Sequence, residues 1–281
     1  MSRQTFIKIV LLIQIIGLTV ASYVPYSDKQ DRIINGNKAQ VGDFPHQVSL
    51  RRVEDSKHFC GGAILSEYWI ITSAQCTQDL HSLPDNIFVV VGTVNMTRGG
   101  LEYAVEKIVS HPHFNWEKRR NDIAMLKTNQ PMKISDGKVF PIALPSFKTN
   151  YTIENGIGLT EVTLSGWGSC NVEGSKIEPS EILRFLKTSH LQRRMCRRHL
   201  GRVNGLLLNE NHLCANVKEG QRINVGDIGS PLVTNDGQLV GIASWQHSTG
   251  YEIGYPDVYT RIFPYKSWIW NNLMDPNDIL I

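Results

Sequence analysis

The segment Gly226–Pro231 reads GDIGSP and holds side chains that bear directly on chemistry. Asp227 carries a carboxylate and Ser230 carries a hydroxyl, whereas Ile228 between them has no nucleophilic atom. A serine hydroxyl attacks a carbonyl group only when a nearby base, most often histidine, takes its proton. The chain has nine histidines, so a serine-dependent site would need one of them beside Ser230.

Five cysteines supply a second kind of chemistry, at positions 60, 76, 170, 196 and 214. In an oxidising compartment cysteines form stable disulfides. Because five is an odd number, at least one thiol is free, capped or paired with another chain.

A third cluster is basic, in the segment LQRRMCRRHLGR, residues 191–202. Arg193 and Arg197, and likewise Arg194 and Arg198, are four residues apart, so on a helix all four would form one basic face. Such a face could bind an acidic partner or a sulfated glycan, and the alternative is a solvated surface without a ligand.

The N-terminal residues predict secretion. Arg3 and Lys8 precede an apolar run over residues 9–20 that ends in the small residues Ala21 and Ser22. This order is typical of a signal peptide, here residues 1–22, and the run is short for a membrane span. Two glycosylation sequons, at Asn95 and Asn150, fit the same compartment, and each predicts a surface loop.

Charge and strand spacing narrow the class of protein. The formal net charge is +3 and falls to +3 − 2 = +1 once Arg3 and Lys8 leave with the signal peptide, which argues against nucleic acid as a partner. Short β-branched and aromatic segments recur between turn residues at intervals typical of an all-β sandwich or barrel. At the C-terminus, Ile269, Trp270 and Leu273 have a helix-like spacing, which predicts a C-terminal helix docked on the barrels.

Eight motifs now follow one another in a characteristic order. They are RIING, HFCGGAIL, YWIITSAQC, NDIAML, LSGWG, GDIGSP, ASW and PDVYTRI. Together they resemble the trypsin- and chymotrypsin-like serine protease family, from about Ile33 to the end of the chain. The resemblance implies two six-stranded antiparallel β-barrels with the active site between them, and an activation peptide at residues 23–32 before a protease-like domain at 33–281.

The resemblance also implies an activation switch. Cleavage after Arg32 would free the amine of Ile33, and Asp227 resembles the residue that pairs with this amine. His58 resembles the histidine that can hold this aspartate before cleavage.

The catalytic positions depart from the family pattern. Asp122 matches the triad aspartate, but Gln75 stands in place of the histidine and Ile228 in place of the serine. A glutamine amide is not basic enough to act as general base, and isoleucine cannot attack a carbonyl. Ser230 is displaced by two residues from the nucleophile position and should project elsewhere. We therefore expect no catalysis, and no cofactor or metal.

The specificity pocket departs from the pattern as well. Arg222 stands at its base, and Gln246 and Asp257 replace wall glycines. We expect the pocket to be filled by its own side chains, with Arg222 and Asp257 as a candidate pair. The alternative is that these are unconstrained polar substitutions in an unused site.

The resemblance implies two disulfides, Cys60–Cys76 and Cys196–Cys214. Cys170 is then left over, either for an intermolecular disulfide or as an inert thiol.

These expectations describe a secreted, non-catalytic serine protease homologue. It would act by binding extracellular proteins, such as proteases or their substrates, as a regulator or cofactor in a protease cascade or comparable network. One alternative is recognition of a glycan or other surface ligand through the basic helix, and another is residual endopeptidase activity.

Overall fold

The computed structural model describes most of the chain after the first 35 residues. The described residues are 36–135, 137–155, 160–168, 180–200, 208–216, 223–224, 226–245 and 255–274. They all belong to one compact unit, Asp31–Ile281. Several predictions concern residues outside these ranges, namely the signal peptide, the activation peptide, Arg32, Ile33, Cys170, Arg222 and Gln246.

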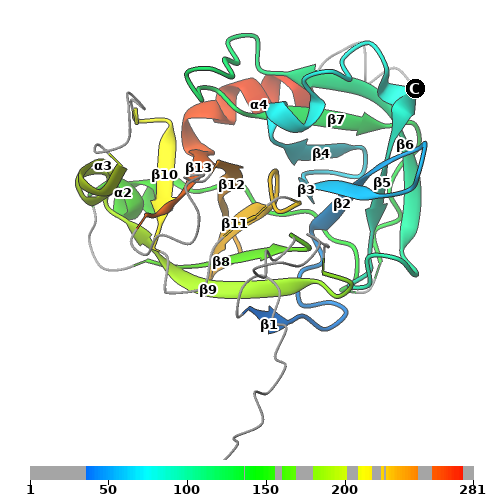
Figure 1. Cartoon of the computed structure of the whole chain (residues 1–281), viewed down its shortest axis with the longest axis horizontal. Coiled ribbons are helices and arrows are strands. Elements are labelled where there is room, and N and C mark those ends of the chain that lie inside the picture. The colour runs from blue at the N-terminus through cyan, green and yellow to red at the C-terminus, as the bar shows by residue number, and fades with distance from the viewer. Residues whose placement is uncertain are drawn as a thin grey trace, which may run out of the picture. The chain divides into compact units, whose positions relative to one another are not determined.

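The first half of the chain forms a closed barrel (Figure 1). Its strands are β2 (Gln47–Arg52), β3 (His58–Ile64), β4 (Trp69–Thr72), β5 (Ile87–Val91), β6 (Leu101–Ser110) and β7 (Ala124–Thr128), joined in the order β2-β3-β4-β7-β6-β5. The interior is filled by aliphatic side chains, among them Leu50, Ile70, Val89 and Leu126. Such side chains suit a pleated surface that is buried on its inner face.

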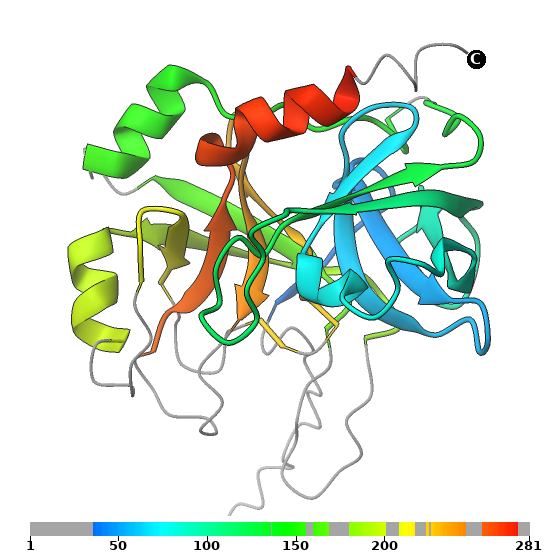
Figure 2. The same ribbon diagram turned by 90° about the horizontal axis from the view of Figure 1, so that it is seen from above.

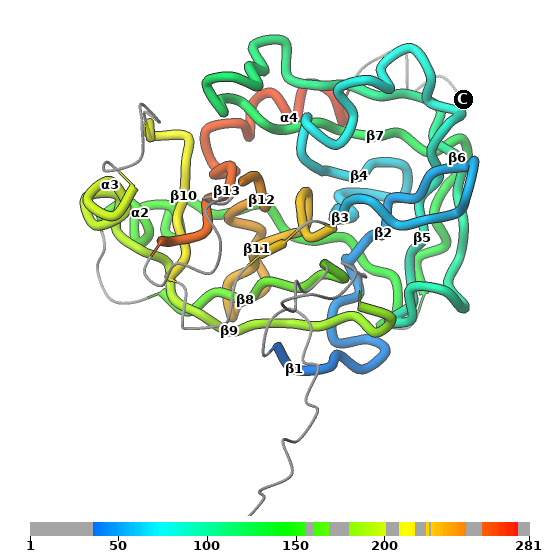
Figure 3. Tube along the Cα trace, in the orientation of Figure 1, coloured from blue at the N-terminus to red at the C-terminus, as the bar shows by residue number. Residues whose placement is uncertain are grey.

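The second half forms another barrel from six antiparallel strands. They are β8 (Glu161–Gly166), β9 (Arg184–Leu191), β10 (His212–Ala215), β11 (Pro231–Thr234), β12 (Leu239–Trp245) and β13 (Asp257–Arg261). The order is β9-β10-β13-β12-β11-β8, and β8 pairs with β9 to close the ring. The short strand β1 (Asn37–Lys38) adds to β9 from outside. The Cα trace in Figure 3 shows one barrel from each half of the chain, as the resemblance implied.

Helical segments cover the barrels. They are η1 (Ala74–Thr77), η2 (Pro84–Asn86), α2 (Phe147–Asn155), α3 (Arg193–Leu200), η3 (Phe263–Tyr265) and α4 (Lys266–Leu273). Among the described residues, no helix combines the length and apolar character that a membrane crossing requires.

The expected C-terminal helix is present as α4, and Figure 2 shows it lying along the barrels. Ile269 is fully buried in a cluster that contains Met125 from the first barrel and Ile242 from the second. Trp270, however, is 47% exposed, so its assignment to the docked face was wrong. With 100° per residue, Trp270 turns away from the barrel when Ile269 faces it.

The turn at residues 226–230, which precedes β11 in the second barrel, packs closely against β3 of the first barrel. The amide of Gly61 in β3 donates to the carbonyl of Ile228 over 2.7 Å. A Cβ atom on Gly61 would lie only 1.9 Å from Ser230 Oγ, so the two backbones approach this closely only because residue 61 is glycine.

Candidate functional site

Asp122 lies just before β7 and is 3% exposed. Its Oδ1 accepts hydrogen bonds from Ser73 Oγ at 2.6 Å and from the Gln75 amide at 2.9 Å. Its Oδ2 accepts from Gln75 Nε2 at 2.7 Å and from Ser244 Oγ at 2.5 Å. Four donors therefore satisfy this buried carboxylate, two on each oxygen.

Gln75 lies in η1 and donates two hydrogen bonds through the nitrogen of its side-chain amide. Nε2 bonds the carboxylate of Asp122 and also the carbonyl of Ser244 in β12, at 2.5 Å. Both N–H groups of the amide are thereby engaged, and an amide nitrogen has no basic lone pair to offer a substrate. The structure thus brings Gln75 and Asp122 together, and the pair links the two barrels.

Ile228 lies beside this pair, since its carbonyl oxygen is 3.7 Å from Sγ of Cys76, the residue after Gln75. Its half-buried side chain packs against the hydrophobic clusters of both barrels. The site therefore presents a hydrocarbon at this position, which can contribute packing but no reactive atom.

Ser230 is fully buried. Its Oγ lies 3.5 Å from Gln47 Nε2, and Gln47 is held in turn by Ser165 Oγ at 2.6 Å. Among the described residues, Gln47 is the one side chain that hydrogen-bonds Ser230. The hydroxyl therefore points into the interface between the barrels, a direction that the sequence did not predict.

Asp227 is fully buried beside this turn. Its Oδ1 accepts from the Gly168 amide at 2.7 Å and its Oδ2 from the Asn224 amide at 3.0 Å. Burial raises the pKa of this carboxyl to about 7, although the two amide donors act in the opposite direction. No cationic side chain of the described residues pairs with Asp227.

His58 does not hold Asp227, contrary to the expectation from the resemblance. Its Nε2 lies 2.9 Å from the carbonyl of Gly226, and its Nδ1 lies 2.8 Å from Ser49 Oγ. Burial lowers the pKa of His58 to about 4, so the ring is neutral. A neutral ring bridges a hydroxyl and a carbonyl well, and Gly226 presents that carbonyl because its φ of 95° suits glycine.

Three residues were expected to fill the specificity pocket, and Asp257 is the one that lies among the described residues. It is 2% exposed, and its Oδ2 accepts from the Ile223 amide at 2.7 Å. Burial, together with the carboxylates of Asp257 and Asp227, raises the pKa of Tyr259 well above its ordinary value. Because Arg222 and Gln246 lie outside the described residues, a filled pocket and an Arg222–Asp257 pair remain predictions.

The two disulfides implied by the resemblance are both present. Cys60–Cys76 joins β3 to η1, and Cys196–Cys214 joins α3 to β10, each with a Cα–Cα distance of 6.2 Å. The first bridge fixes the segment that carries Gln75.

The two sequons lie in different surroundings. Asn95 lies in the loop between β5 and β6, as expected, but it is half-buried and forms an isolated β-bridge with Ile182. Its Oδ1 accepts from the Thr97 and Arg98 amides. Asn150 lies within helix α2, so the expected loop was wrong there. The helix forms because Ile153 packs into the core of the second barrel.

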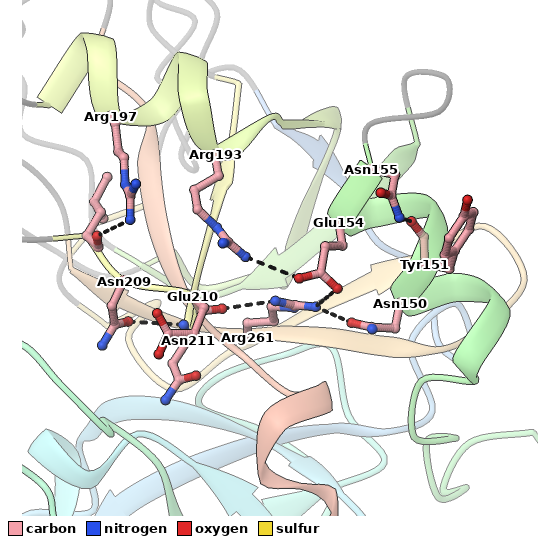
Figure 4. A network of polar contacts seen from close by, with 11 residues as sticks. Asn150, Tyr151, Glu154, Asn155, Arg193, Arg197, Asn209, Glu210, Asn211 and Arg261 are labelled. Carbon is pink, nitrogen blue, oxygen red and sulfur yellow. Dashed lines mark hydrogen bonds and ion pairs between the residues drawn. The ribbon is translucent and has the colours of Figure 1, made fainter.

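A polar network that the sequence analysis missed surrounds Asn150 (Figure 4). Arg261 donates to Asn150 Oδ1 and lies 3.3 Å from Glu154 Oε2, and it also bonds the Glu210 carbonyl at 3.0 Å. Over a hundred residues separate Arg261 from Asn150 and Glu154, so no local pattern indicates the contact.

Two closed six-stranded barrels, with a buried aspartate where they meet, define the two-barrel class of serine protease folds. The chain belongs to the trypsin family, because the family model described as Trypsin matches residues 33–269. It is 32% identical over 239 residues to "Trypsin Blo t 3" of Blomia tropicalis, covering 84% of each chain. It is 30% identical over 267 residues to "Trypsin" of Phaedon cochleariae, covering 94% of this chain and 97% of the relative.

Proposed function

We propose that this chain is a secreted member of the trypsin family that does not hydrolyse peptide bonds. It acts by binding extracellular proteins, as a regulator or cofactor in a protease cascade or comparable network. The observation that carries the proposal is the contact between Gln75 and Asp122, in which both side-chain N–H groups of the residue at the base position are engaged as donors.

Residual endopeptidase activity is the competing function, and the names of the relatives favour it. It would need another nucleophile and another base in the site. The nearest hydroxyl of the GDIGSP turn, Ser230, is buried against Gln47 and Gly61. Loss of a member of a catalytic unit costs about a millionfold in rate, which makes the two substitutions together a strong argument for inactivity.

Secretion is supported by the apolar N-terminal segment and by the two disulfides, which persist in oxidising compartments. Affinity purification from the native fluid, with the amino terminus sequenced in the same sample, tests both the partner class and cleavage after Arg32.

An active-site-directed fluorophosphonate probe tests the loss of catalysis. We expect no labelling of the chain and no hydrolysis of reporter peptides with Arg, Lys, Tyr or Leu before the cleaved bond. The matched control is the double variant Gln75→His with Ile228→Ser, which restores a base and a nucleophile at the two positions. This variant should react with the probe but hydrolyse the peptides poorly, because we expect the side chains at 222 and 246 to fill the pocket.

Labelling of the unmodified chain that disappears in Ser230→Ala would overturn the proposal. Trypsin-like turnover by the double variant would instead contradict only the obstructed pocket.

A further inference from the structure

Helix α3 presents its arginines as one surface on the second barrel. Cys196 and Leu200 are fully buried and anchor the helix, and the disulfide to Cys214 fixes it to β10. At 100° per residue, the four arginines at 193, 194, 197 and 198 occupy one sector of about 140°, in which Arg193 lies next to the buried Leu200 and Arg194 and Arg198 lie farthest from it. The expected basic face therefore exists, and we call these four residues the α3 basic face.

Two of these arginines hold the helix in place. Arg193 Nη2 lies 3.7 Å from Glu154 Oε1 in α2, and Arg197 Nη2 donates to the Leu208 carbonyl at 3.1 Å. In Figure 4 both side chains point from α3 toward the segments beneath it.

The other two arginines have no carboxylate partner among the described residues. Arg194 and Arg198 are exposed, and the guanidinium group of Arg198 contacts the sulfur of Met195 at 3.9 Å. They are one helical turn apart, about 6 Å along the axis. Two guanidinium groups are therefore free to bind an anion in the solvent.

A small cavity opens next to the same face. It has a volume of about 30 Å³, and Arg193, Arg261 and His190 are among the residues that line it. Arg261 is 6% exposed, and its Nε has no hydrogen-bond partner among the described residues. Two guanidinium groups, of Arg193 and Arg261, share the carboxylate of Glu154, which is the one acidic side chain among the residues that line the cavity. The carboxylate of Glu210, outside the lining, also acts on Arg261.

We propose that the α3 basic face binds a sulfated polysaccharide, with one anionic group of that chain at the mouth of the cavity between Arg193 and Arg261. Guanidinium groups pair with sulfate-type oxygens through parallel hydrogen bonds. The formal charge of the chain without its first 22 residues is only +1, so the attraction comes from this local cluster.

The surroundings favour a polysaccharide over a protein partner. Protein interfaces have an apolar, often aromatic centre. None of the exposed large apolar side chains of the described residues lies in α3 or in residues 208–216. Anion binding by the α3 basic face requires neither the presence nor the absence of catalysis.

The test uses heparin as the sulfated probe and polyglutamate as an unsulfated polyanion. The variant Arg194→Gln with Arg198→Gln removes the two unpaired arginines. The matched control, Arg98→Gln with Lys138→Gln, removes the same charge at two exposed positions of the first barrel. Because all four side chains are exposed, we expect both variants to fold, which thermal melting checks.

At about 0.15 M salt, the unmodified chain should bind heparin more tightly than polyglutamate. The α3 variant should bind heparin roughly three- to tenfold more weakly, and the slope of log affinity against log salt should fall by about two. The control variant should bind as the unmodified chain does. Equal losses in both variants, no binding of the unmodified chain, or equal affinity for polyglutamate would overturn the proposal.

A second variant tests the cavity. Glu154→Gln removes the one carboxylate among the residues that line it, so heparin binding should become tighter. Unchanged or weaker binding by the folded variant would contradict a role for the cavity.

Discussion

Gln75 changes what the buried carboxylate of Asp122 can do. An imidazole between a carboxylate and a nucleophile can accept a proton, whereas the Gln75 amide donates to Asp122 on one side and to Ser244 on the other. The same geometry that positions a base in a catalytic site here joins three segments. They are η1, strand β12 and the residues just before β7. The hydrogen bonds of Gln75 to Asp122 and Ser244 therefore stabilise the junction of the two barrels.

The pKa of Asp227 yields a prediction for the uncleaved chain. The folded value of about 7 lies above the ordinary value of 3.8, so the folded state binds more protons than the unfolded state between these pH values. The contribution of Asp227 to stability should therefore fall as the pH rises from about 4 to about 7, by on the order of 4 kcal/mol. Buried His58, whose pKa is lowered to about 4, contributes in the opposite direction, so the effect of Asp227 is the difference between the unmodified chain and Asp227→Asn. Asp227→Asn should remove this fall and make the chain more stable at pH 8.

Urea unfolding of the uncleaved chain at several pH values measures this effect. Asp85→Asn, at an exposed position, is the control and should leave the profile unchanged. Parallel profiles for the unmodified chain and Asp227→Asn would show that burial does not shift this carboxyl.

At the scale of elements, strand β3 and the turn at residues 226–230 depend on each other. The glycine at 61 and the side chain at 230 share one space, and the hydroxyl of Ser230 occupies it. This contact ties the strand of one barrel to the turn of the other.

Gly61→Ala should destabilise the fold by about 1–3 kcal/mol, because the new methyl group collides with Ser230. Adding Ser230→Gly should recover part of this loss, since it removes Oγ and Cβ but leaves the Cα, which lies 2.9 Å from the place that the methyl group would take. A double-mutant cycle by urea unfolding should give a coupling of about 0.5–3 kcal/mol. The control is Ser146→Gly, at an exposed position before α2, which should show no coupling to Gly61→Ala. Additive effects of Gly61→Ala and Ser230→Gly would contradict the prediction that the two side chains compete for one space.

The disulfides also make a prediction, since the two bridges leave one cysteine of the five, Cys170. Thiol titration of the unfolded, unreduced chain should find one free thiol per chain, or none together with a dimer that reductant separates on a gel. Peptide mapping identifies the residue. A bridge between Cys170 and any of the other four cysteines would contradict the pairing.

The sequence predicted the helices and strands better than it predicted the contacts that individual side chains make. Segment spacing and the resemblance predicted both barrels and α4, and the resemblance assigned Gln75 and Asp122 to positions of one site. The sequence could not predict that His58 bonds the carbonyl of Gly226. The choice between this acceptor and the carboxylate of Asp227 depends on the shape of the turn. The helix at Asn150 was missed because a sequon carries no information on backbone conformation, and the exposed Trp270 because spacing alone does not select which side of a helix is buried.

At the scale of the whole molecule, cleavage after Arg32 should stabilise the fold. A freed Ile33 amine that entered the body would pair with Asp227, and full burial of an isoleucine side chain contributes about 1.5–3 kcal/mol. The cleaved chain should therefore melt roughly 3–12 °C higher than the uncleaved chain. Asp227→Asn should abolish the difference.

Differential scanning calorimetry before and after complete cleavage measures this change, with partner binding followed in parallel. Equal melting temperatures and equal binding before and after cleavage would contradict the switch. The cleavage site after Arg32 would then be an inherited feature, and the protein would bind its partner whether or not it is cleaved.

The contact between Arg261 and Asn150 sets an order of events during biosynthesis. In the folded chain Asn150 lies in a packed helix, its Oδ1 is held by Arg261, and the hydroxyl of Thr152 donates to the Lys148 carbonyl. An enzyme that attaches a glycan must bind the sequon in a conformation that this helix does not offer. Modification at Asn150 and formation of α2 therefore compete in time, and the fraction of chains that carry a glycan there would record how quickly the second barrel folds.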